Sequence, residues 1–205
     1  MSTSNLTVGA EGSALVREHA GFSPASKGEV GMACLIVAES TIFAIFVVAY
    51  LYYLGRDLHG PTPREVLRLP ILNTVCLLSS SITITLAVRA LTAGFVSQFA
   101  GWWLATIALG GYFLLGTGIE WYHLIYEKGL TIKTNLFGTT FYSLVGLHAS
   151  HVVVGLVALL TVMCLTLART VKRAHAKRVE ILAIYWHFVD VVWIVVLTVV
   201  YIIGR

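Results

Sequence analysis

Five long apolar stretches constrain the fold of this chain more than any other feature of its sequence. They lie near residues 31–54, 71–91, 101–119, 139–168 and 180–203. About 20 mainly apolar residues form a helix long enough to cross the hydrocarbon core of a bilayer. The stretches are continuously apolar and lack the alternating pattern of strands in a membrane β-barrel. The sequence therefore predicts an all-α, polytopic membrane protein, a bundle of five transmembrane helices.

The composition agrees with a membrane location. Only 12% of the 205 residues are charged and 58% are hydrophobic, whereas soluble domains carry about 25% charged residues. These values exclude an ordinary soluble fold, a disordered chain and a nucleic-acid-binding module. Cys34, Cys76 and Cys164 each lie inside an apolar stretch without Cys-x-x-Cys spacing. We therefore interpret them as small apolar packing residues.

The chain divides into a polar head and a membrane domain. Residues 1–28 are rich in Ser, Thr, Gly and Glu and lack the pattern of a cleavable secretory signal. We expect this head to be retained and to precede a five-helix domain at residues 29–205. Eight Lys and Arg residues fall on the side of the N-terminus and six on the other side. Because Lys and Arg collect on the cytoplasmic side, the count predicts a cytoplasmic N-terminus.

Ionisable residues inside apolar spans are costly, so each is a candidate for function. Glu39 lies near the middle of the first span, and it is either a proton-relay or lipid-contacting carboxyl or a neutral acid bonded to another helix. The remaining candidates lie in or at the ends of the later spans: Glu120, His123, His148, His151, Glu180, His187 and Asp190.

Two pairs among these residues have helical spacing. His148 and His151 are three residues apart, so we expect both rings to face the same neighbouring helix. They could bind a metal together with other ligands, or form hydrogen bonds between helices. His187 and Asp190 have the same spacing, which predicts that Asp190 orients His187. This second pair is either an acid–base dyad or a polar contact that sets helix rotation.

Small residues in the second and third spans predict close helix packing. They are Ser79, Ser80, Ser81, Thr83, Thr85, Gly110, Gly111, Gly116 and Gly118. A transporter built from inverted repeats would have paired, broken spans in two related halves. Five unlike spans fit that architecture poorly, so we interpret these residues as packing seams.

Several strings in the sequence resemble a known family. Residues 185–193, Tyr-Trp-His-Phe-Val-Asp-Val-Val-Trp, closely resemble the signature of subunit III of haem–copper terminal oxidases. Residues 138–152 resemble the family's Gly-x-x-Phe…Gly-x-His-x-x-His-Val segment. Upstream, Pro70–Thr74, Glu120–Tyr122 and Glu39-Ser40, which reverses the usual Ser-Glu order, follow the family order. The resemblance covers residues 28–204.

The resemblance implies a non-redox accessory subunit of a bacterial cytochrome c oxidase in the inner (plasma) membrane, with a periplasmic C-terminus. Such a subunit docks on subunit I, and the haems and copper belong to partner subunits. Further partners are subunit II, small subunits or a respiratory supercomplex. Phospholipids bind in a cleft whose wall includes the first two helices of seven-helix forms. This chain resembles the five-helix form, so one wall is missing unless another subunit supplies it.

The family also implies roles for individual residues. The carboxyl matching Glu39 lies in the lipid cleft and helps to maintain proton uptake and turnover lifetime. Structural or lipid-related roles are implied for Glu120, His148, His151, Glu180, His187 and Asp190. One basic loop is a candidate contact for anionic lipid headgroups, or a topology signal alone; its cations are Arg169, Lys172, Arg173, Lys177 and Arg178.

Three alternatives stay open. The first is subunit III of a quinol oxidase, although Glu39 and the Asn73-Thr74 pair favour the cytochrome c branch. The second is an intramembrane metalloenzyme that uses His148, His151 and His187. The third is a small transporter.

Overall fold

The computed structural model describes residues 26–56, 67 and 69–204, so residues 1–25 of the polar head lie outside the described part. Its long helices are α2 (Lys27–Tyr53), α4 (Ile71–Ala93), α5 (Val96–Tyr126), α6 (Leu136–Leu167) and α7 (Ala176–Leu197). A 3-10 turn, η2 (Arg173–His175), precedes α7, and a π-helical turn, η3 (Thr198–Ile203), continues it. All five long helices are apolar enough to cross a membrane, and the described residues form no strand. The predicted all-α bundle of five membrane helices is confirmed.

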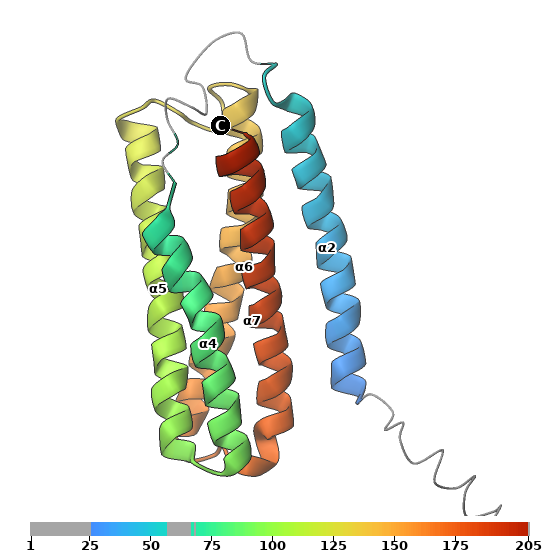
Figure 1. Ribbon diagram of the computed structural model, residues 1–205, viewed down its shortest axis with the longest axis vertical. Coiled ribbons are helices and arrows are strands. Elements are labelled where there is room, and N and C mark those ends of the chain that lie inside the picture. The colour runs from blue at the N-terminus through green and yellow to red at the C-terminus, as the bar shows by residue number, and fades with distance from the viewer. Residues whose placement is uncertain (1–25, 57–66, 68, 205) are drawn as a thin grey trace, which may run out of the picture.

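Consecutive long helices run in opposite directions (Figure 1). The start of α2, the α4–α5 connection and the α6–α7 connection lie at one end of the bundle, and the end of η3 lies at the other. Helices α4 to α7 stand together, while α2 packs beside α6 and α7. The fold is therefore a four-helix core with one peripheral helix.

Local sequence signals determine where the helices begin and turn. Ser26 caps α2, because its hydroxyl accepts a hydrogen bond from the Glu29 N–H at 3.3 Å. The Glu29 carboxylate in turn accepts from the Ser26 N–H at 2.7 Å, which completes a capping box. Gly94 ends α4 with φ of 93°, a left-handed conformation open to glycine at little steric cost. Since α5 starts at Val96, α4 and α5 form a tight antiparallel hairpin.

Buried tryptophans organise the four-helix core. They are Trp103, Trp186 and Trp193. Each indole N–H donates to an oxygen on a neighbouring helix at 2.8 to 3.1 Å. The Trp186 ring lies between Gly110 and Gly155, where an added Cβ would come within 2.8 Å of it. Gly110 thus provides the predicted close packing, whereas Gly111 and Gly118 face open space and do not.

Helix α2 is much less buried than the core helices. Only Phe43 and Tyr50 of α2 are buried, so most of its apolar surface is free to contact lipid or a partner. Cys34 of α2 and Cys164 of α6 are exposed free thiols. The prediction that they are packing residues is wrong, because a small apolar side chain also suits a helix face turned toward lipid.

Candidate functional site

Glu39 of α2 and His151 of α6 form a direct pair across the groove between these helices. Glu39 Oε2 lies 3.0 Å from His151 Nε2. His151 Nδ1 lies 2.8 Å from the Leu147 backbone oxygen. That oxygen can only accept, so Nδ1 carries a hydrogen and Nε2 faces the carboxyl. Glu39 and His151 therefore hold one proton between Oε2 and Nε2, either as two neutral groups or as an ion pair.

The Glu39–His151 pair lies at the surface of the bundle. Its side chains remain 23% and 14% exposed, respectively. A cavity of about 200 Å³ beside them is also lined by Leu35, Val154 and Tyr185. The Tyr185 hydroxyl donates to the His151 backbone oxygen at 3.2 Å. Because Glu39 lies halfway along α2, the site combines a shared proton with an apolar opening near the middle of the membrane.

His148 occupies a different environment. Its ring is fully buried, stacks on Trp193 with 5.0 Å between ring centroids, and meets the edge of Phe113. Neither ring nitrogen has a hydrogen-bond partner among the described residues. The prediction that His148 and His151 face the same helix is wrong. Three residues rotate a helix position by about 60°. This rotation is enough for His151 to face α2 while His148 faces α5 and α7.

His187 and Asp190 are linked through Ser81 of α4. The Ser81 hydroxyl donates to Asp190 Oδ2 and lies 2.9 Å from His187 Nδ1. Thr85 of α4 lies 3.4 Å from the other ring nitrogen of His187. The direct contact predicted between His187 and Asp190 is replaced by a serine bridge. Ser81 was predicted only as a packing residue, since sequence spacing within α7 cannot show which helix packs against it.

The two remaining acids of the predicted set lie toward opposite ends of the bundle. Glu120 of α5 accepts a hydrogen bond from the Tyr201 hydroxyl at 3.1 Å. Tyr201 was missed in the sequence, because a tyrosine inside an apolar span does not stand out as polar. Glu180 is exposed and lines a shallow hollow with Arg89 near the start of α7.

The cations of the basic loop lie at the surface, and Lys177 is the one with a partner in the described part of the chain. Lys177 forms an ion pair with Glu29 of α2. The same carboxylate closes the capping box with Ser26, so the pair joins the starts of α2 and α7. Glu29 was missed because it lies outside the apolar spans, although the Ser-x-x-Glu spacing signals a helix start.

These polar groups do not converge on a metal site. Across residues 26–56, 67 and 69–204, no three His, Cys, Asp or Glu side chains are arranged to hold a metal ion. Glu39 and His151 lie in the α2 groove, while His148 and His187 point elsewhere. The geometry gives no support to the metalloenzyme alternative.

Comparison with known proteins identifies the family. The sequence model of the family described as cytochrome c oxidase subunit III matches residues 15–205. A cytochrome c oxidase subunit 3 from Thermostichus vulcanus is 34% identical over 206 residues, which cover 97% of this chain and 98% of the relative. Those from Synechocystis sp. and Bacillus sp. are 39% and 32% identical, over 83% and 85% of this chain and 73% and 85% of the relatives.

The family model and the relatives agree with the resemblance found in the sequence. Because the relatives are oxidase subunits, the chain is a membrane component of an oxidase complex. It belongs to the cytochrome c oxidase subunit III family.

Proposed function

We propose that this chain is a non-redox accessory subunit of a bacterial cytochrome c oxidase. It docks on subunit I, binds phospholipid, and supports the assembly, proton uptake and turnover lifetime of the complex. Haems and copper are carried by partner subunits, among them subunit I, and subunit II completes the core. The N-terminus lies in the cytoplasm and the membrane is the plasma membrane.

The Glu39–His151 pair is the observation that supports this proposal most strongly. A lone charge near the middle of a bilayer is costly, and the shared proton lets the two groups remain neutral together. The 3.0 Å contact lets a proton move between Oε2 and Nε2 without a large movement of either helix. Such a pair can buffer protons on the side of the subunit that lipid reaches.

Lipid contact is supported by the surface of α2 and by the basic loop. Val37, Ile45 and Val48 of α2 are each more than 60% exposed. At the end of the bundle where α2 begins, Arg169 and Arg173 are exposed, and they suit anionic headgroups. Lys177 contributes less to this site, because it is paired with Glu29.

Co-purification tests the docking proposal. The full chain, tagged and isolated from its own host under mild detergent, is expected to bring subunits I and II with it, identified by mass spectrometry. Oxygen consumption by the complex is expected with reduced cytochrome c and not with quinol. Isolation of the chain without an oxidase subunit would contradict docking, and oxidation of quinol alone would favour the quinol branch.

A further inference from the structure

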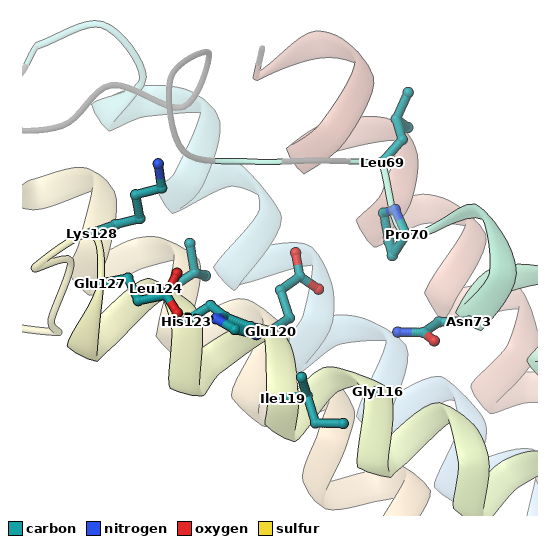
Figure 2. A pocket seen from close by; sticks show the side chains of 10 residues that line it. All are labelled: Leu69, Pro70, Asn73, Gly116, Ile119, Glu120, His123, Leu124, Glu127 and Lys128. Atoms are coloured by element: carbon teal, nitrogen blue, oxygen red, sulfur yellow. Dashed lines mark hydrogen bonds and ion pairs between the residues drawn. The ribbon is translucent and has the colours of Figure 1, made fainter.

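A cavity lies at the end of the bundle where α4 begins and α5 ends, away from the groove between α2 and α6. Its volume is about 440 Å³, which suits a small polar group of a ligand. Pro70 and Asn73 line one side, and Gly116, Glu120 and Lys128 line the other (Figure 2). The proposed function assigns no role to this cavity or to the polar side chains in it.

Two polar side chains are held in position in this cavity. The Tyr201 hydroxyl donates a hydrogen bond to Glu120 Oε1 at 3.1 Å. The other carboxyl oxygen, Oε2, is left to bind a ligand. Asn73 packs against Gly116, where any Cβ would clash with the Asn73 amide. Figure 2 shows Asn73 and Glu120 projecting from α4 and α5 into the space between these helices. A ligand there meets the Glu120 carboxyl on one side and the Asn73 amide, whose nitrogen faces the cavity, on the other.

The charges of the cavity are separated along its length. No Lys or Arg in the described ranges forms an ion pair with Glu120. At the rim, the Glu127 carboxyl oxygen Oε1 lies 2.7 Å from His123 Nδ1, within hydrogen-bonding distance. Lys128 lies at the edge of the cavity, just before the left-handed turn at Gly129, where φ is 66°. The inner part thus accepts hydrogen bonds and a positive charge at Glu120, and the rim carries the Lys128 ammonium beside the Glu127–His123 pair.

This charge separation matches a zwitterion. We propose that the cavity binds the headgroup of a phospholipid with a primary ammonium, as in phosphatidylethanolamine. The ammonium donates to Glu120 Oε2, the Asn73 amide lines the opposite side of the headgroup site, and Lys128 binds the phosphate. A quaternary ammonium has no N–H to donate, and an anionic headgroup without an amine leaves Glu120 without a countercharge.

Apolar surface next to the cavity favours a lipid over a soluble zwitterion. Leu72 of α4 and Leu115 and Ile119 of α5 are 62%, 70% and 60% exposed. Ile119 lines the cavity, and Leu115 lies one turn along α5 toward the middle of the bundle, where acyl chains would lie. The exposed Tyr122 and Tyr126 suit the membrane interface, the depth of a phospholipid headgroup.

Native mass spectrometry of the intact oxidase tests the site. The delipidated complex is given phosphatidylethanolamine, phosphatidylcholine or phosphatidylglycerol, and tightly retained lipids are counted per complex. Glu120→Gln keeps an acceptor for Tyr201 but removes the charge, and Gly116→Ala displaces Asn73 if the first variant fails to assemble. Glu180→Gln is the matched control, because Glu180 is an acid at the opposite end of the bundle.

We expect the parent to retain one phosphatidylethanolamine that Glu120→Gln and Gly116→Ala lose, with binding weakened about 10-fold or more. Glu180→Gln and Glu39→Gln are expected to retain it, so this site and the proposed function can fail separately. Equal retention by Glu120→Gln, or equal retention of phosphatidylcholine or phosphatidylglycerol at the site, would overturn the proposal. Saturable binding of free phosphoethanolamine alone would overturn the lipid assignment.

Discussion

Polar side chains have different roles in the core of α4 to α7 and in the groove between α2 and α6. In the core, polar groups join helices: Trp186 donates to the buried Ser80, and the partly buried Ser81 bridges His187 and the buried Asp190. In the groove, Glu39 and His151 share a proton while remaining partly exposed. The difference separates polar groups that fix helix packing from a surface pair to which we assign proton exchange.

The largest effect is expected from breaking the serine bridge in the core. Asp190 is 3% exposed, and Asp190→Leu leaves the Ser81 hydroxyl without its acceptor. Losing a buried partner costs about 1 to 3 kcal/mol, so we expect a lower unfolding temperature and poor recovery of the complex. Asp190→Asn keeps an acceptor and is the control. Equal recovery of the leucine variant would show that the bridge does not hold the core.

A loss of similar size is expected from filling a glycine seam. In Gly155→Ala, the new Cβ comes within 2.8 Å of the locked Trp186 ring, and overpacking of this kind costs about 1 to 3 kcal/mol. Gly111→Ala faces open space and gains helix propensity of up to about 1 kcal/mol. Thermal unfolding in detergent compares the unfolding temperatures of the two variants. An equal change in both temperatures would contradict the claim that Gly155 is needed for close packing against Trp186.

The smallest change in stability is expected at His148. His148→Phe removes two ring nitrogens that have no hydrogen-bond partner among the described residues, and it keeps a ring to stack on Trp193. A change of similar shape in a core costs less than about 1.5 kcal/mol, and the variant oxidase should keep its catalytic lifetime. His151→Phe removes the partner of Glu39 and should shorten that lifetime. Equal catalytic lifetimes of the two variant oxidases would contradict the claim that His148 in the core and His151 in the groove have different roles.

Much of the fold was predictable, because apolar length alone determines which segments cross a membrane. The site was predictable only in part. Composition identified Glu39 and Asp190 as polar residues in apolar spans, but not their partners. Ser81 lies 109 positions from Asp190, and such contacts depend on which helix faces which. His148 and His151 show the same limit. Their spacing of three residues predicted one shared neighbouring helix, but their rings contact different helices.

Proton uptake and turnover lifetime of the Glu39→Gln oxidase test the central claim most directly. The amide that replaces the Glu39 carboxyl can donate to His151 Nε2 and so keep the contact, but it cannot take up or release a proton. With Glu180→Gln as control, we predict normal assembly of Glu39→Gln, slower proton uptake and fewer turnovers before inactivation. Uptake and lifetime equal to those of the parent would contradict the role assigned to the Glu39–His151 pair.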